Sequence, residues 1–366
     1  MSTPFDVRMM QRCLALAKRG AGQVSPNPLV GCVIVRNGRI VGEGWHRRFG
    51  GPHAEIFALL RAGPSAKGAV AYVNLEPCAH FGKTPPCVDA LIRAGIAKAV
   101  IAAADPNPLV HGRGIRRLRN AGIRVDVGCL KTEAESLNEK FFRFMISGLP
   151  FVGVKFAQTL DGYIADRNGR SKWISSEQSR ASVHRLRTEY DAVLVGAKTV
   201  LHDDPRLTVR HVPGRNPVRV VIDGRLSSGD SKRIFRTADA PTWLLTSARA
   251  IAAKQSLVQS LVSRGVRVLP AAQNSDLTGR AILRTLAAEG ISSVLIEGGS
   301  KTAAVFFQES LVDVLYLFTA PMTLGGGTRA IAFHPPRVLR SPGLWKLRKA
   351  DPVYGDLLIE ARFQNT

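Results

Sequence analysis

The sequence has little of several features that would place it in a special class of protein. Its 366 residues include only five cysteines, an odd number at irregular spacing, which argues against a disulfide framework. No apolar run is long enough to span a bilayer. The first six residues lack the basic-then-apolar order of a secretory signal. We therefore expect a cytoplasmic protein with no membrane partner.

Acidic residues are also scarce, with 28 Asp and Glu against 51 Lys and Arg, a net charge of +23. So large an excess makes nucleic acid a candidate partner. The basic residues are nevertheless spread along the chain, and the few aromatic residues, 7% of the total, are not interleaved with them. A small anionic substrate or a phosphorylated cofactor fits the charge equally well, so nucleic acid binding is the minority hypothesis.

What the sequence does contain is typical of a folded enzyme. Apolar residues make up 45% and charged residues 22%. The length favours two domains. Gly148, Leu149 and Pro150 interrupt a helical pattern, and we place the boundary there, with domains at 1–147 and 148–366.

Metal-ligating residues are concentrated between positions 53 and 87. His53, Cys78 and Cys87 can supply three protein ligands to a tetrahedral zinc, leaving the fourth position for water, as in catalytic sites. Glu55 can then move protons between that water and a substrate. A His-x-Glu followed by Pro-Cys and a second Cys is typical of zinc-dependent base deaminases. A structural zinc, with His80 as fourth ligand, is the rival hypothesis.

Helices and strands alternate in the first half, which indicates an α/β sandwich. Asn37-Gly38 between two apolar runs predicts a hairpin. His53, Glu55 and Cys87 fall near helix N-termini, where the positive end of the dipole favours thiolates. We expect helices at 5–19, 54–62, 85–94, 112–121 and 131–146, and strands at 29–36, 39–45, 68–75, 98–103 and 123–127.

The second half continues the alternation without a dinucleotide-binding fingerprint, because no G-x-G-x-x-G follows a strand. The turn at Gly298-Gly299-Ser300, from a strand into a helix, is a weak candidate for binding phosphate. We expect strands at 151–157, 191–195, 217–223, 242–246, 266–270, 292–296 and 312–319, and helices at 176–187, 252–263, 277–289 and 301–309.

The cysteine spacing distinguishes between types of deaminase. Nucleic-acid deaminases use Cys-x-x-Cys, whereas eight residues separate Cys78 from Cys87. The segment 77–87 (PCAHFGKTPPC), together with 26–32, 51–55, 105–108 and 112–114, closely resembles the deaminases of riboflavin biosynthesis. The resemblance implies a cytidine-deaminase-like α/β/α sandwich, with Glu55 as the catalytic acid and base. Candidate substrate contacts are Asn27, His46, His80 and Lys83, for which a structural role is about as plausible.

The second half resembles the reductase domain of the bifunctional riboflavin enzymes. The motifs that carry this resemblance lie at 160–162, 171–174, 195–200, 203–205, 207–210 and 297–300. The resemblance implies a dihydrofolate-reductase-like fold that uses NADPH. The implied cofactor-binding residues are Ala157, Trp173, Thr199, Asp203, Gly299, Ser300, Lys301 and Thr302. The implied substrate-binding residues are Ser171, Arg187, Asp203, Leu207, Arg210 and Glu297.

These observations predict a bifunctional enzyme of riboflavin synthesis. The first domain would deaminate 2,5-diamino-6-(5-phosphoribosylamino)pyrimidin-4(3H)-one with zinc, and the second would reduce the ribosyl group to ribityl with NADPH. Arg187 and Arg210 suit the substrate phosphate, since guanidinium pairs with it bidentately. The alternatives are a nucleic-acid base deaminase with an RNA-binding second domain and a non-catalytic zinc protein. Assembly into a homo-oligomer stays open.

Overall fold

The computed structural model describes residues 2–81, 85–108, 110–331 and 345–363. The chain separates into two compact units, Met1–Gly148 and Leu149–Thr366. In the part of the chain that is described, no helix is both long and apolar enough to cross a membrane.

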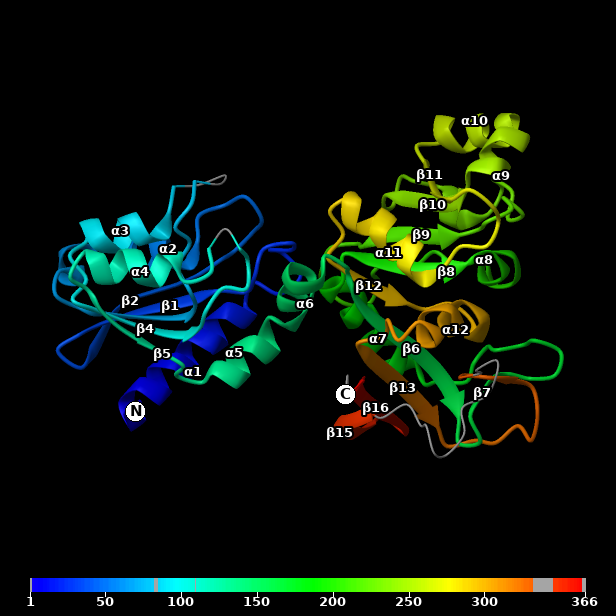
Figure 1. Ribbon diagram of the computed structural model, residues 1–366. Coiled ribbons are helices and arrows are strands. Elements are labelled where there is room, and N and C mark those ends of the chain that lie inside the picture. The colour runs from blue at the N-terminus through cyan, green and yellow to red at the C-terminus, as the bar shows by residue number, and fades with distance from the viewer. Residues whose placement is uncertain (1, 82–84, 109, 332–344, 364–366) are drawn as a thin grey trace. The chain divides into compact units, whose positions relative to one another are not determined.

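The first unit is built on a sheet in the order β2-β1-β3-β4-β5 (Figure 1). The β1–β2 hairpin turns at Asn37 and Gly38, whose φ angles of 50° and 74° are those of the predicted tight turn. The strands are β1 (Gly31–Arg36), β2 (Arg39–Trp45), β3 (Val70–Leu75), β4 (Lys98–Ala103) and β5 (Arg124–Val127). The helices are α1 (Pro4–Lys18), α2 (Ala54–Ala62), α3 (Cys87–Arg93), α4 (Arg113–Asn120), α5 (Lys131–Leu137) and α6 (Glu139–Ser147).

Helices cover both faces of this sheet, which confirms the predicted three-layer sandwich. Ala58, Leu91 and Leu118 carry α2, α3 and α4 into the core on one face, and Met10 carries α1 into the core on the other. Helix α2 lies very close to β2, because a Cβ at Gly44 would come within 2.3 Å of the Ala54 carbonyl oxygen. This close approach fixes the start of α2, where His53 and Glu55 lie.

The single helix predicted at 131–146 is wrong, because the chain breaks at Asn138 into α5 and α6. Asn138 is buried, and its side chain binds both backbone groups of Leu29. The Leu29 N–H donates to Oδ1 at 2.7 Å, and Nδ2 donates to the Leu29 carbonyl at 2.9 Å. This long-range pairing replaces helical continuity at Asn138.

The second unit contains a larger sheet in the order β11-β10-β9-β8-β12-β6-β13-β16-β15. The pairs from β11 to β13 are parallel, and β16 and β15 add an antiparallel edge. Its strands are β6 (Phe151–Thr159), β8 (Ala192–Gly196), β9 (Val218–Ile222), β10 (Thr242–Ser247), β11 (Arg267–Ala272), β12 (Ser293–Ile296), β13 (Val314–Ala320), β15 (Trp345–Val353) and β16 (Asp356–Phe363). A separate ribbon pairs β7 (Tyr163–Ala165) with β14 (Thr328–Arg329).

Helices pack on both faces of this sheet as well. Leu286 and Phe306 bring α11 and α12 into one core, and Val183 and Leu261 bring α7 and α10 into the other. The helices are α7 (Glu177–Glu189), α8 (Ala197–Asp203), α9 (Ala248–Ala253), α10 (Gln255–Ser263), α11 (Gly279–Ala288) and α12 (Ser300–Gln308). The helix predicted at 252–263 is wrong in extent, since α9 and α10 divide at Lys254, whose ammonium donates to the Leu226 carbonyl.

Candidate active sites

The three predicted metal ligands come together in the first unit. His53 is the residue before the first turn of α2, Cys87 opens α3, and Cys78 lies in the loop after β3. His53 Nδ1 lies 3.2 Å from Cys87 Sγ and 3.6 Å from Cys78 Sγ, and all three donor atoms fall within 4.8 Å of one another. One imidazole and two thiols converging in this way fit a zinc ion with a position left open.

His80 does not join this ligand group. Among the residues that the structure describes, the cluster that could hold a metal is His53, Cys78 and Cys87. His80 Nδ1 is itself buried and has no hydrogen-bond partner among the described residues. This arrangement does not support the structural-zinc hypothesis, which needs a fourth protein ligand.

Neighbouring groups favour the thiolate form of Cys78. The hydrogen bond from the Cys87 thiol and the neighbouring His53 hold the pKa of Cys78 well below its ordinary value. The backbone N–H of Cys87, at the start of α3, also donates to Cys78 Sγ at 3.3 Å. The Cys78 thiolate is therefore stabilised as the metal-binding form.

Glu55 lies in the first turn of α2 and is buried. Its Oε2 has no hydrogen-bond partner within the described residues, and burial raises the pKa of this carboxyl above its ordinary value. A buried carboxyl with one free oxygen beside the ligand cluster can hold and release a proton there.

The half-buried Asn27 and the buried His46 form a pair beside His53. The His46 ring lies edge-on to the His53 ring at 5.1 Å. Nδ1 of His46 lies 3.1 Å from the Pro52 carbonyl, which can only accept, so Nε2 accepts from Asn27 Nδ2 at 3.1 Å. Through His46, Asn27 is therefore hydrogen-bonded to Pro52, the residue before His53. Lys83, the fourth candidate substrate contact, lies outside the described residues.

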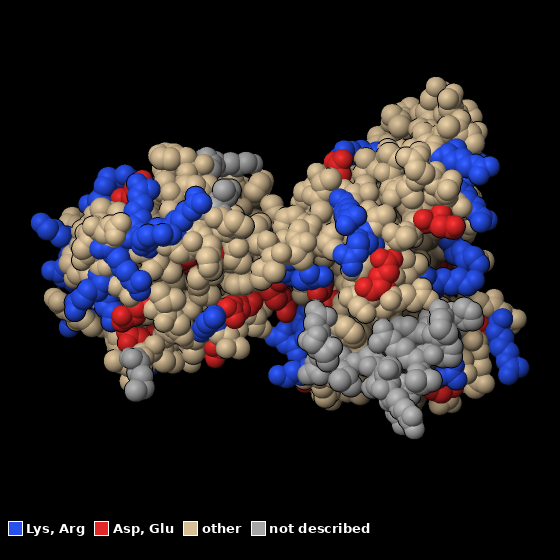
Figure 2. Space-filling view, in the orientation of Figure 1, with Lys and Arg blue, Asp and Glu red and all other residues tan. Residues whose placement is uncertain are grey.

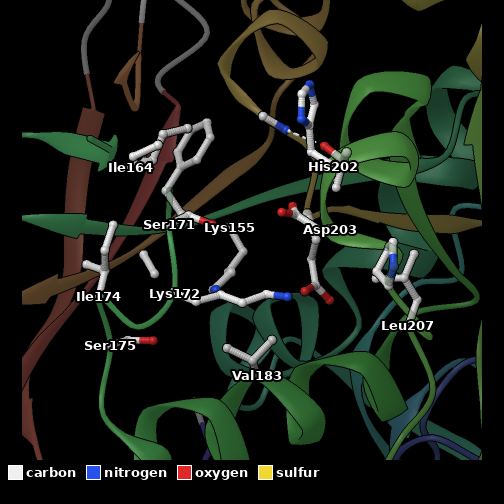
Figure 3. A pocket seen from close by; sticks show the side chains of 18 of the residues that line it. Lys155, Ile164, Ser171, Lys172, Ile174, Ser175, Val183, His202, Asp203 and Leu207 are labelled. Carbon is white, nitrogen blue, oxygen red and sulfur yellow. Dashed lines mark hydrogen bonds between the residues drawn. The ribbon is translucent and has the colours of Figure 1, made fainter. Parts of the chain in front are cut away.

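The second unit has a cavity of about 800 Å³ at the carboxyl ends of β6, β8 and β12. Ligands commonly bind at this edge of a parallel sheet. Ten of the predicted residues line the cavity, namely Ala157, Ser171, Trp173, Arg187, Thr199, Asp203, Leu207, Arg210, Glu297 and Gly299. Figure 3 shows Lys155, Lys172 and Asp203 extending toward the same space.

The predicted residues Ser300, Lys301 and Thr302 are not part of the cavity lining. They form the first turn of α12, which starts directly after Gly299. The Gly299 N–H donates weakly to Thr199 Oγ1 at 3.4 Å, so the turn before α12 meets the start of α8. At Gly299, where the cavity reaches α12, a Cβ would meet nothing closer than Thr199 Oγ1 at 4.0 Å, and such an open backbone suits a phosphorylated cofactor.

Arg187 and Glu297 form a buried ion pair at the wall of the cavity. Nε and Nη2 of Arg187 donate to Oε1 and Oε2 of Glu297 at 2.7 and 2.9 Å, and the two side chains are 11% and 9% exposed. Nη1 of Arg187 also donates to the Thr208 carbonyl at 2.8 Å. The bidentate face expected to bind phosphate is therefore occupied by Glu297, whereas Arg210 is exposed and its guanidinium donates only to Thr208 Oγ1 within the described residues.

Two further cavity residues were missed by sequence reasoning. Lys155 projects from β6, and its ammonium lies 5.6 Å from the centre of the Phe318 ring; burial lowers its pKa. His184 lies one turn before Arg187 on α7 and is buried. The signal for Lys155 was present, since a single charge interrupts an otherwise apolar strand, but nothing local distinguishes His184.

On the face seen in Figure 2, the described Lys and Arg side chains do not gather into one stripe but are scattered over the surface of both units. A continuous basic track of the kind that follows a nucleic-acid backbone is not visible on that face.

Comparison with known proteins points the same way for both units. Residues 4–103 match the cytidine and deoxycytidylate deaminase zinc-binding region, and residues 150–356 match the RibD C-terminal domain. The riboflavin biosynthesis protein RibD of Aquifex aeolicus is 45% identical, covering 89% of this chain and 90% of its own length. The RibD of Escherichia coli is 41% identical over 94% of both chains.

Solved structures agree over nearly the whole chain. Acinetobacter baumannii RibD has a TM-score of 0.89 and 37% identity, covering 99% of both chains. A Thermotoga maritima protein, described as a diaminohydroxyphosphoribosylaminopyrimidine deaminase and 5-amino-6-(5-phosphoribosylamino)uracil reductase, has a TM-score of 0.87 and 40% identity. It covers 98% of this chain and 99% of its own.

Proposed function

Because the chain belongs to the RibD family of riboflavin biosynthesis proteins, we propose a specific role for each of its two sites. The chain is a bifunctional enzyme with deaminase and reductase activities. The deaminase would lie within residues 1–147 and the reductase within 148–366.

We propose that His53, Cys78 and Cys87 hold the zinc ion of the deaminase. The convergence of their three donor atoms beside the free oxygen of Glu55 is the observation that carries this proposal. Bound zinc would supply a Lewis acid that activates water. Glu55 would take the proton at Oε2 and return it to the ring of 2,5-diamino-6-(5-phosphoribosylamino)pyrimidin-4(3H)-one as ammonia leaves.

Zinc content tests the ligand assignment. Cys78→Ala should lose both bound zinc and ammonia release. Cys129→Ala is the matched control, because Cys129 is a buried thiol outside the ligand cluster. Zinc retained at the wild-type ratio in Cys78→Ala would rule out Cys78 as a ligand.

We propose that the cavity of the second unit binds NADPH and the deaminated pyrimidine side by side. NADPH would supply a hydride to the ribosyl carbon. Ala157, Trp173, Thr199 and Gly299 would line the cofactor, together with the first turn of α12 at Ser300, Lys301 and Thr302. Ser171, Leu207 and Arg210 would hold the substrate, Arg210 through its phosphate. Asp203 would contact both, and the Arg187–Glu297 pair would complete the substrate wall.

Trp173 offers the simplest test of the cofactor site, because its side chain lines the cavity but is 68% exposed, so its loss should not impair folding. Trp173→Ala should weaken NADPH binding, measured as a dissociation constant by fluorescence titration. Tyr354→Ala, which removes a 75% exposed ring away from the cavity lining, should bind NADPH like the wild type. Equal affinities in all three proteins would place the cofactor elsewhere.

The RNA-binding alternative is not favoured, because residues 150–356 match a reductase domain. The cytoplasm is the proposed compartment, since it keeps thiols such as Cys78 and Cys87 reduced.

A further inference from the structure

The loop at residues 204–211 lines the cavity on the side assigned to the substrate, and its backbone is unusual. Leu207 has a φ of 54°, and Asp204 and His211 have φ angles of 41° and 68°. Positive φ is disfavoured for residues that carry a branched or bulky side chain. Such conformations persist only where the surroundings hold them, and they cluster at functional sites. Hydrogen bonds to residues outside the loop hold this backbone in place.

The guanidinium of Arg219 is hydrogen-bonded to the backbone of this loop. This residue of β9 is fully buried. Its Nη1 donates to the carbonyl of Arg206 at 3.2 Å, and its Nη2 donates to the carbonyls of Arg236 and Ala240 at 2.9 and 2.8 Å. The guanidinium thus joins the residue that immediately precedes Leu207 to the segment 233–240, which we call the brace.

Two further links join the loop to the same brace. Asn216 accepts from the Val209 N–H at 2.7 Å and donates from Nδ2 to the Asp239 carbonyl at 2.9 Å. The Asp204 carboxylate accepts from the backbone N–H and from Nε of Arg233 at 2.7 and 2.9 Å. The loop is therefore bonded to the brace before Leu207, at Asp204 and Arg206, and after Leu207, at Val209 through Asn216.

Packing alone does not account for an arginine at this position. Arg219 makes no ion pair with a described carboxylate, and its Nε has no partner there. Burying a charge without a carboxylate is unfavourable. What the arginine supplies, and an apolar residue would not, is one rigid group that reaches three carbonyls on two segments.

We propose that Arg219 is a positioning residue for the reductase. By fixing the Arg206 carbonyl against the brace, it keeps Leu207 and Arg210 in the arrangement that binds the phosphoribosyl substrate. This inference rests on the proposed reductase function. Because the loop lies on the side of the cavity assigned to the substrate, loss of the Arg219 hydrogen bonds should weaken binding of the pyrimidine and leave NADPH binding intact.

Arg219→Lys tests the inference, because lysine keeps the charge but one ammonium cannot reach all three carbonyls in this geometry. Asn216→Ala removes the link from Val209 to Asp239 at an exposed position. This variant tests the inference if Arg219→Lys does not fold. Thr242→Val is the matched control, since the Thr242 hydroxyl donates to Ile234 of the brace at 3.0 Å and makes no bond to the loop.

The measurements are the KM for the deaminated pyrimidine, the dissociation constant of NADPH and the melting temperature, all on the full chain. We expect the KM to rise about ten- to a hundredfold in Arg219→Lys, with a smaller rise in Asn216→Ala. NADPH affinity should stay within about twofold, and Thr242→Val should keep the wild-type KM.

An unchanged KM in a folded Arg219→Lys, or in Asn216→Ala if Arg219→Lys is unfolded, would overturn the inference and leave the proposed function standing. An equal rise in Thr242→Val, or a parallel loss of NADPH affinity, would reduce Arg219 to a general structural role. Failure of the wild-type protein to oxidise NADPH with this substrate would instead refute the proposed function.

Discussion

At the scale of single residues, the proposed deaminase mechanism depends on one carboxyl group. Glu55 is buried beside the ligand cluster, and burial raises its pKa. A group of this kind can carry a proton between water and an amine in an environment that excludes bulk solvent.

Replacing Glu55 with Gln should reduce ammonia release by about 10²- to 10⁴-fold, because the amide cannot accept the proton. The zinc content should not change, since Glu55 is not in the ligand cluster. Reduction of a supplied deaminated pyrimidine serves as the internal control. Near-normal ammonia release in this variant would leave the site without its acid and base.

His184 predicts a pH dependence for the second unit. Burial, together with Arg187 and Arg210, lowers the pKa of His184 to about 4 from an ordinary value of 6.5. Its Nδ1 accepts from the Arg210 N–H at 3.0 Å, which requires the neutral ring. Between pH 6.5 and 4 the unfolded chain binds a proton at this residue that the folded chain does not, so the free energy of unfolding should fall as the pH falls.

His184→Asn isolates this effect, because Oδ1 of asparagine can accept the same hydrogen bond but does not titrate. Denaturant titrations from pH 4.5 to 7 should show a shallower fall in stability for the variant than for the wild type. Parallel curves would mean that His184 is protonated in the folded protein at an ordinary pKa.

Residues with rare chemistry in a local pattern could be predicted from the sequence, and residues defined by long-range contacts could not. His53, Glu55, Cys78 and Cys87 fall within one stretch of chain and depend only on helix starts and one loop. The pairing of Arg187 with Glu297, by contrast, joins residues 110 positions apart, and no local sequence pattern at either residue predicts it.

At the scale of elements, the same ion pair ties α7 to the end of β12. Burial opposes ionisation of Glu297, but the Arg187 guanidinium outweighs it and holds the pKa of Glu297 below its ordinary value. The stabilisation that this pair provides is therefore present above the unfolded pKa of about 4.5 and is lost only as the pH falls through the lower folded value.

Glu297→Leu alone should destabilise the second unit by about 3–5 kcal/mol, because it leaves the Arg187 charge buried without a partner. The double variant Arg187→Met/Glu297→Leu should recover most of this loss in stability, though not substrate binding. Urea unfolding of the single and double variants measures both values. A double variant no more stable than Glu297→Leu would show that packing, rather than the unpaired charge, governs the effect.

Element prediction failed where tertiary contacts override local pattern. Residues 131–146 have continuous helical periodicity, yet Asn138 breaks the helix by binding Leu29, 109 residues away. Helix α8 was not predicted, because a seven-residue helix containing Thr and Val gives little signal. The β15–β16 hairpin was also missed, since β15 is an exposed edge strand whose alternation of apolar and polar residues stops at Arg348.

At the scale of the whole molecule, each unit has hydrophobic clusters of its own. The proposed metal ligands lie in one unit and the 800 Å³ cavity in the other. The alternation of helices and strands was enough to predict an α/β class for both units, but not how the strands are ordered; the particular folds were implied by the family resemblance.

Chelation should therefore separate the two activities. Removing zinc should abolish ammonia release and leave NADPH oxidation unchanged when the deaminated pyrimidine is supplied directly, because the cavity contains none of the proposed metal ligands. Added zinc should restore the first activity. Loss of both activities, with both restored by zinc, would show that the metal supports the reductase as well.

A paired assay on the zinc-loaded protein tests both proposed activities most directly. The diaminopyrimidine ribosylamine phosphate is supplied first and ammonia is followed, and NADPH is then added and its oxidation is followed. The two proposed activities predict ammonia release without NADPH, then one NADPH consumed for each ammonia released. Ammonia without NADPH oxidation would contradict the reductase assignment, and no ammonia from the zinc-loaded protein would contradict the deaminase assignment.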